Sequence, residues 1–268
     1  MPKVTKPSSE SDFRPISITP ILCRLLEKQI VCRFFYPILT NPLQNCMYSD
    51  QYAFRPTGST SAALIALTHN ISELLNSNQY VHVIALDFSK AFDTVRHAYL
   101  ASILAKLPIP DNIYNWVIAF LTGRQHCTKF QGAISTYIEI NASIVQGSGF
   151  GPVNFINAIS RFSTVNPTNR LLKYADDCYL LIPSSNSASV SIELDNVSRW
   201  AAECNLALNK KKTSDMLIRR KRAGPGNLTN PCATPGLTRV TSMAILEVTV
   251  SDDFGFKDHI HLICCQAI

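Results

Sequence analysis

The sequence predicts an α+β fold, and two observations support this. Segments with helical periodicity and short strand-like segments follow one another without the regular strand–helix–strand alternation of a doubly wound fold. The 268 residues are 46% hydrophobic and only 16% charged, against about 25% charged residues in a typical soluble domain. The chain can therefore bury a substantial core, organised as one large domain or two small ones.

The helices are predicted from apolar residues at helical spacing and from residues that favour helix ends. Residues 61–76 form the clearest case, behind a Ser59–Thr60 start, and residues 190–204 show the same pattern. We expect further helices over residues 111–121 and 153–161.

The strands are predicted from β-branched runs and from alternation of apolar and polar residues. Residues 80–88 (YVHVIALDF) are typical of a buried strand, and residues 136–145 alternate. Residues 173–182 predict two short strands folded about Asp176–Asp177, and a last hairpin is expected around residues 248–256.

The start of the chain and the cysteines bear on the compartment. Residues 1–12 are polar, and no stretch approaches the roughly 20 apolar residues that span a bilayer. The nine cysteines include no C-x-x-C pair, which favours buried free thiols over a disulfide frame or a zinc site. We therefore expect an intracellular protein, nuclear or cytoplasmic, that is neither secreted nor bound to membranes.

The net charge of +6 is concentrated in one stretch of the chain. Residues 210–222 hold seven basic residues and Asp215, so the remainder of the chain sums to zero. A solvated basic segment and a contact with a polyanion both fit this pattern.

Three aspartates lie in apolar surroundings, where a charged side chain is unfavourable unless a function or a partner compensates it. Asp87 ends the predicted buried strand, and Asp176 and Asp177 lie at the tip of an apolar hairpin. If they meet within ~5 Å, each like-charge pair costs roughly 3 kcal/mol at an effective dielectric of ~20. Two divalent cations would remove that cost and would suit phosphoryl chemistry. The alternative is that Asp176 and Asp177 are ordinary turn residues and Asp87 a helix cap.

Six separated segments, in order, resemble the reverse transcriptase of LINE-type, non-LTR retrotransposons. They are residues 12–17 (DFRPIS), 51–60 (QYAFRPTGST), 85–93 (ALDFSKAFD), 146–152 (QGSGFGP), 174–177 (YADD), and Leu208-Asn209 followed by Lys212-Thr213. The resemblance implies a right-hand polymerase palm, an antiparallel sheet with packed helices, together with fingers and a missing or truncated thumb. The implied division is a flexible tail over residues 1–11, fingers and palm over 12–222, and a linker, primer-grip-like hairpin and truncated start of a thumb over 223–268.

The resemblance also implies roles at a catalytic centre. Asp87 and Asp176 would ligate two magnesium ions with Asp177 beside them, and the main-chain carbonyl of Phe88 would complete one ion's shell. Lys212 would be the candidate proton donor to pyrophosphate, although Lys210 and Lys211 offer the same chemistry.

Four further residues are implied to contact the nucleotide. Arg55 would grip the triphosphate, and the ring of Phe92 would leave no room for a 2′-hydroxyl. Gln146 and Gly147 would lie against the nascent base pair and the template. The alternatives are a surface arginine, a core aromatic residue and a merely flexible turn.

The basic residues Arg219, Arg220, Lys221 and Arg222 are the candidates for nucleic-acid binding. Together these expectations describe an RNA-directed DNA polymerase fragment that joins dNTPs to a DNA primer on an RNA template. Two other functions stay open, a catalytically weak or inactive remnant that only binds nucleic acid, and a two-metal nuclease.

Some residues depart from the family's pattern. Leu246-Glu247 stands where the primer-gripping hairpin typically has Leu-Gly, and Glu at a positive φ would cost about 1–2 kcal/mol. Arg161 stands where an acid is expected, and Asn154 and Asn157 add polarity to a predicted helix. These departures suggest a decaying copy whose catalytic acids are all retained.

Overall fold

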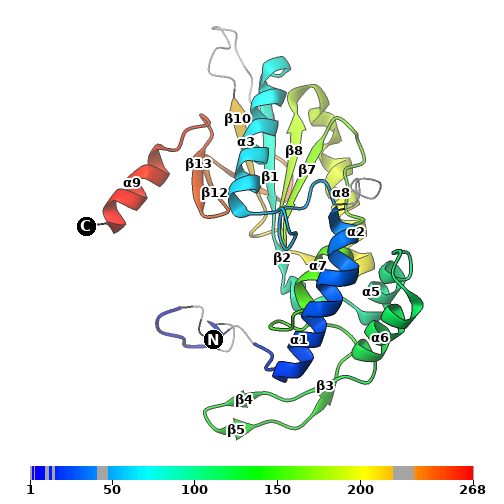
Figure 1. The fold of residues 1–268 in the computed structure, drawn as a ribbon. Coiled ribbons are helices and arrows are strands. Elements are labelled where there is room, and N and C mark those ends of the chain that lie inside the picture. Colours follow the sequence, from blue (N-terminus) through cyan, green and yellow to red (C-terminus); the bar gives the residue numbers. More distant parts are fainter. Residues whose placement is uncertain are drawn as a thin grey trace. The chain divides into compact units, whose positions relative to one another are not determined.

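The structure is a computed structural model that describes residues 2, 4–9, 12–13, 16–40, 48–219, 231 and 233–267 (Figure 1). The chain divides into two compact units, one formed by Met1–Asn45 with Lys90–Ser160 and the other by Cys46–Ser89 with Arg161–Ile268. Helices and mainly antiparallel strands alternate irregularly, so the α+β prediction is confirmed. In these described ranges no helix is both long and apolar enough to cross a membrane.

The second unit is built on a sheet to which the described residues contribute five strands. Their spatial order is β11 (Thr238–Val240), β10 (Ser214–Arg219), β1 (Tyr80–Leu86), β8 (Asp177–Pro183) and β7 (Arg170–Tyr174). β1 is central and pairs antiparallel with both β8 and β10, and β7 pairs antiparallel with β8. β11 joins β10 in parallel, so the sheet is not wholly antiparallel.

Helix α3 (Thr60–Ser77) covers one face of this sheet (Figure 1). The side chains of Leu67 and Ile71, four residues apart and therefore on one face of the helix, pack in a buried cluster with Val81, Val83 and Met216. Val81 and Val83 alternate along β1, which places them on the same face of the sheet. The two periodicities read from the sequence meet in this core.

The remaining elements of the second unit are short, apart from one long helix. They are β2 (Phe88–Ser89), the 3-10 helix η4 (Ser184–Ser189), α8 (Val190–Cys204), β9 (Ala207–Leu208), β12 (Ser242–Ile245), β13 (Val248–Ser251) and α9 (Lys257–Gln266). β2 pairs with β9, and β12 with β13. A late hairpin is therefore present, but the predicted range 248–256 was wrong, because the paired strands span residues 242–251.

The first unit is mainly helical. Its elements are α1 (Ile21–Ile30), the π-helix η2 (Val31–Phe35), α2 (Tyr36–Thr40), α4 (Ala91–Thr94), α5 (His97–Leu104), α6 (Asp111–Leu121), β3 (Gln125–His126), β4 (Lys129–Phe130), β5 (Ala133–Ile134), β6 (Ile138–Glu139) and α7 (Gly151–Ala158). Nearly every residue of α7 is buried.

The prediction of a continuous strand over residues 136–145 was wrong. Only Ile138–Glu139 forms strand there, on an exposed ribbon that offers no second sheet face to bury the alternating apolar residues. Further along, the main chain turns to a different partner, because Ser143 N donates to Val95 O and Ile144 N to Phe92 O.

The cysteines that the structure describes are all free thiols. The expectation that they are buried holds for Cys178 and Cys204 only, while Cys32, Cys264 and Cys265 are exposed.

Candidate active site

Asp87 and Asp177 face each other across two neighbouring strands. The last paired residues of β1 and β8 are Leu86 and Cys178, so the next pair outward in this antiparallel register is Asp87 and Asp177. Side chains at directly opposed positions have Cβ atoms about 4.5–5.5 Å apart. The pairing of β1 with β8 therefore unites two acids that lie 90 positions apart in the sequence.

Asp176 lies in the tight turn between β7 and β8. Tyr174 pairs with Asp177, which leaves Ala175 and Asp176 as a two-residue loop. Ala175 has a φ of +55°, a conformation that costs most L-residues about 1–2 kcal/mol. The chain thus holds the turn in a sharp conformation that exposes Asp176 beside the opposed pair.

A buried glutamine supports this turn. Gln51 is 1% exposed, and its Oε1 accepts hydrogen bonds from the main-chain N–H groups of Ala53 (2.8 Å) and Ala175 (3.3 Å). Tyr52 N donates to Lys173 O, and the Lys173 ammonium lies 2.9 Å from an oxygen of Asp50. The loop that contains Gln51 is therefore tied to the strand that leads into the acidic turn.

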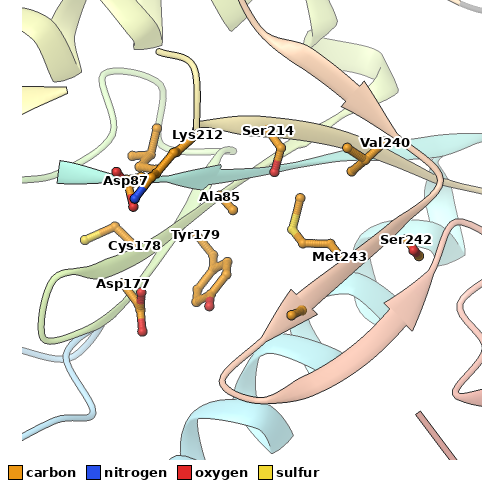
Figure 2. A pocket seen from close by; sticks show the side chains of 12 residues that line it. Ala85, Asp87, Asp177, Cys178, Tyr179, Lys212, Ser214, Val240, Ser242 and Met243 are labelled. Atoms are coloured by element: carbon orange, nitrogen blue, oxygen red, sulfur yellow. The ribbon is translucent and has the colours of Figure 1, made fainter. Parts of the chain in front are cut away.

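The acids open onto a pocket of about 290 Å³ within the second unit. Figure 2 shows Asp87, Asp177 and Lys212 toward one end and Ser242 toward the other, with Tyr179 and Met243 between them. Alternation along β1 and β8 puts Asp87 and Ala85, and likewise Asp177 and Tyr179, on the same face of the sheet. Asp176, unlike Asp177, is not one of the residues that line the pocket.

The acids influence one another electrostatically. Although Asp177 as a residue is exposed, partial burial of its carboxyl group raises its pKa to about 6, and the negative charges of Asp176 and Asp87 act in the same direction. Carboxylate oxygens are the ligands that hard divalent cations prefer, so the chemistry of the donor set fits Mg²⁺. In the described part of the chain, however, no three His, Cys, Asp or Glu side chains form an assembled metal-binding group.

The segment after β9 holds the main chain of Asp87. Asn209 N donates to Asp87 O (2.8 Å), and Asp87 N donates to the hydroxyl of Thr213 (3.3 Å), which is fully buried. Lys212 stands between these two anchors and lines the pocket, whereas Lys210 and Lys211 do not. Geometry thus favours Lys212 among the three neighbouring lysines.

Comparison with known proteins decides the family. The family model "Reverse transcriptase (RNA-dependent DNA polymerase)" matches residues 2–249. This chain belongs to the reverse transcriptase family. Members of this family act on RNA templates and generally use divalent metal ions.

Curated relatives place this reverse transcriptase domain among non-LTR retrotransposons. It is 26% identical to the probable RNA-directed DNA polymerase from transposon X-element of Drosophila melanogaster, over 83% of this chain and 25% of that protein. It is 27% identical to the probable RNA-directed DNA polymerase from transposon BS of the same fly, over 94% of this chain and 29% of that protein. It is also 27% identical to a Pol polyprotein of the R2 element of Popillia japonica, over 97% of this chain and 36% of that protein. The chain thus spans about a quarter to a third of these relatives.

Solved structures support the fold. The telomerase of Candida tropicalis, in complex with a fragment of telomeric RNA, matches with a TM-score of 0.55 at 12% identity, over 86% of this chain and 36% of that chain. The telomerase of Candida albicans matches with a TM-score of 0.54 at 12% identity, over 87% of this chain and 36% of that chain. The reverse transcriptase domain therefore has a polymerase palm and fingers fold.

The residues expected to contact nucleotide and template belong mostly to the first unit. The ring of Phe92 stacks on Phe155, with centroids 4.1 Å apart and planes at 16°. Gly147 has a φ of +104°, and a Cβ there would lie 2.6 Å from Ser17 O. Gln146 O accepts the N–H of Ser17 at 2.8 Å. The start of the 146–152 turn is therefore in close contact with Ser17, and the roles of Gln146 and Gly147 remain predictions.

Other predicted site residues are placed less directly. The guanidinium of Arg55 donates to the carbonyls of Tyr48 and Gln51, so its triphosphate role remains a prediction. The side chain of Phe88 is buried against Trp200, with ring centroids 5.6 Å apart. The role of its carbonyl also remains a prediction.

The predicted basic surface lies away from the acids, as far as it is described. Arg219 pairs with Tyr80 at the end of β1 opposite to Asp87, which at about 3.3 Å per residue is roughly 23 Å away. Arg220, Lys221 and Arg222 lie outside the described residues. Arg219, at the end of β10, thus lies beside the end of β1 that is far from Asp87.

The hairpin of β12 and β13 turns at Leu246 and Glu247, which the sequence analysis places where the family's primer-gripping hairpin typically has Leu-Gly. Leu246 and Glu247 have φ values of +46° and +71°, which is the pattern of a two-residue type I′ turn, where Asn-Gly is normally preferred. Leu246 N donates to the hydroxyl of Tyr179 at 3.3 Å. A side chain two positions after Asp177 thus connects the acidic strand to this turn.

Sequence reasoning gave no role to Gln51 or Glu27. Glu27 is fully buried on α1, where one carboxylate oxygen accepts the N–H of Phe150 and the other accepts the thiol of Cys23, both at 3.1 Å. Phe150 directly precedes α7, so Glu27 satisfies a donor at the start of that helix. One sequence signal could have identified Glu27 as a buried acid. It lies four residues after Cys23 and three before Ile30, which places it on the inward-facing side of the helix.

Proposed function

We propose that this chain is an RNA-directed DNA polymerase module that performs template-directed nucleotidyl transfer from dNTPs to the 3′-hydroxyl of a DNA primer. The observation that carries the proposal is the opposition of Asp87 and Asp177 beside Asp176, in a chain of the reverse transcriptase family. Such an arrangement suits phosphoryl transfer, where positioning and electrostatic stabilisation supply most of the catalysis.

The three aspartates would hold two Mg²⁺ ions in this proposal, with the carbonyl of Phe88 as an added ligand. Bound Mg²⁺ would supply activation of the attacking oxygen and stabilisation of charge on the leaving phosphate. The pKa of Asp177 is raised first by burial and then by the charges of Asp176 and Asp87, and a bound cation would offset both effects on the carboxylate.

The chain's own residues would do the remaining work. Lys212 lines the pocket beside Asp87 and would donate a proton to the departing pyrophosphate. Phe92, held by its stack on Phe155, would exclude a 2′-hydroxyl. Gln146 and Gly147 would support the nascent base pair, and Arg55 would bind the triphosphate. Because these reactants are intracellular, we propose that the protein acts inside the cell.

Primer extension tests the proposal. A DNA primer annealed to an RNA template is incubated with dNTPs, Mg²⁺ and the wild-type chain or the Asp87→Asn or Asp177→Asn variant. We expect template-dependent extension by the wild type and a loss of roughly two to three orders of magnitude in either variant, because several kcal/mol of charge stabilisation disappear. Asp195→Asn, which changes an exposed acid on α8 of the same unit, is the matched control.

The alternatives give different results. Extension by Asp87→Asn at the wild-type rate would contradict the proposal. Degradation of labelled nucleic acid without dNTPs would favour a two-metal nuclease. Salt-dependent binding that survives Asp87→Ala, without extension by any folded preparation, would favour a remnant that only binds nucleic acid, a candidate that the strained turn at Leu246 and Glu247 also favours.

A further inference from the structure

Asp93 holds the side chain of Gln146. The Nε2 group of Gln146 donates a hydrogen bond of 2.8 Å to Oδ1 of Asp93, and both residues are half-buried within the first unit. This length is typical of a charge-assisted hydrogen bond, which is stronger than a neutral one. No role follows for Asp93 from the sequence, although it closes the segment ALDFSKAFD.

The main chain explains why these two side chains meet. Residues 92–97 run beside residues 141–144, with hydrogen bonds from Ile144 N to Phe92 O, from Ser143 N to Val95 O and from His97 N to Asn141 O. The turn that begins at Gln146 follows directly from this pairing. The contact is therefore imposed by the backbone and is not a chance encounter of two surface side chains.

The contact determines how the Gln146 amide is oriented. A carboxylate can only accept hydrogen bonds, whereas the two ends of an amide differ, one donating and the other accepting. Asp93 must therefore face Nε2, which leaves Oε1 as the end directed elsewhere. The main chain of Gln146 is fixed as well, because its carbonyl accepts the N–H of Ser17.

We propose that Asp93 is a positioning residue that fixes the Gln146 amide in the orientation needed for the incoming nucleotide. This inference rests on the proposed function, in which Gln146 lies against the nascent base pair. Without Asp93 the amide can rotate and flip, and nucleotide binding then has to immobilise it. Asp93 acts on affinity for dNTP and leaves the chemical step at Asp87 unaffected.

A double-mutant cycle in the primer-extension assay tests this inference. The variants are Asp93→Ala, Gln146→Ala and the double variant, each assayed over a range of dNTP concentrations. We expect Asp93→Ala to raise the KM for dNTP roughly three- to tenfold with little change in kcat. In the Gln146→Ala background the Asp93 substitution should add almost nothing, because its effect passes through Gln146.

Two further variants separate positioning from general damage. Asp93→Asn keeps an acceptor but also offers a donor, so we expect a KM between those of wild type and Asp93→Ala. Asp111→Ala, which removes an exposed acid from the first turn of α6 in the same unit, should leave KM unchanged. An Asp93→Ala effect that persists in full without Gln146 would overturn the inference, since Asp93 would then act through Phe92 or through the fold.

A second measurement does not depend on catalysis. With ¹⁵N-labelled glutamine, the side-chain amide signal of Gln146 is assigned by its loss in Gln146→Ala and followed in the wild type and Asp93→Ala. We expect this signal to shift and to exchange faster with solvent in Asp93→Ala, while the amide of Gln51 stays unchanged. An unaltered Gln146 signal would overturn the inference. A wild-type chain that extends no primer, yet shows the Asp93-dependent signal, would contradict the proposed function and leave the positioning contact established.

Discussion

Removing one of the opposed charges should stabilise the metal-free chain while it destroys the proposed activity. In the unfolded chain Asp177 loses its proton near its ordinary pKa of 3.8, whereas in the folded chain it does so near 6. The folded state therefore binds more protons between these values, and stability falls as the pH rises through this window. The penalty is complete above pH 6 and absent below about pH 4.

The size of the penalty follows from the pKa difference. About two pH units correspond to about 3 kcal/mol, but the residue is largely open to solvent and screening reduces the value to about 1 kcal/mol. We expect Asp177→Asn to raise the free energy of unfolding by this amount at pH 7.5 without divalent cations. The gain should shrink toward zero as the pH approaches 4.

Magnesium should reverse the order of stability. At about one hundred times its dissociation constant, Mg²⁺ stabilises a chain that binds it only when folded by about 2.7 kcal/mol, so the wild type should then exceed Asp177→Asn. Urea denaturation with and without Mg²⁺ measures both effects, with Asp195→Asn as the control. An Asp177→Asn chain that is equally or less stable than wild type in the absence of metal would refute the reasoning.

Three other changes have defined outcomes. Glu247→Gly should raise the free energy of unfolding by about 1 kcal/mol in urea denaturation by relieving the positive φ, whereas Glu247→Ala should not; equal values would contradict the strain. Asp215→Asn removes a buried carboxylate whose pKa is lowered by His82 and Arg239 against the opposing effect of burial, and should cost about 3 kcal/mol at pH 7. Because that carboxylate contributes stability only above its ordinary pKa of 3.8, the difference should diminish below about pH 4 in the same assay. Glu27→Ala should speed hydrogen exchange of the Phe150 amide while β1 stays protected; unchanged exchange would show that the contact is not held in solution.

Local sequence patterns predicted the helices α3, α6, α7 and α8 and the hairpin of β7 and β8 because these depend on residues close together in the chain. The helix around Leu67 and the hairpin about Asp176 follow from periodicity and turn chemistry alone. The opposition of Asp87 and Asp177 does not, because it depends on the register of β1 against β8. Spacing alone therefore left the turn-residue alternative open, and only the resemblance to a family brought the acids together.

The basic stretch, residues 210–222, shows that residues close together in the sequence can also lie far apart in the fold. In the sequence, Lys212 and Arg219 belong to one segment, residues 210–222, that carries the net positive charge. β10 separates them, because its start near Ser214 pairs beside the acids and its end at Arg219 pairs with Tyr80. The strand length of about 20 Å places Lys212 at the pocket and Arg219 remote from it.

The structure locates the departures from the family's pattern in the scaffold and not at the acids. Asn154 is 2% exposed, and within the described residues its Oδ1 has no hydrogen-bond partner, which costs about 1–3 kcal/mol. The turn at Leu246 and Glu247 adds strain. Against a typical total stability of about 5–15 kcal/mol, these losses are large, while Asp87 and Asp177 retain their opposed positions.

If a wild-type preparation is inactive, we therefore expect the cause to be a folding defect and not a defect in the catalytic site. Glu247→Gly separates the two, because it relieves the turn and alters none of the proposed catalytic acids. Extension by this variant at a temperature where the wild type fails would place the defect in the scaffold, and a folded but inert variant in Mg²⁺ would place it at the site.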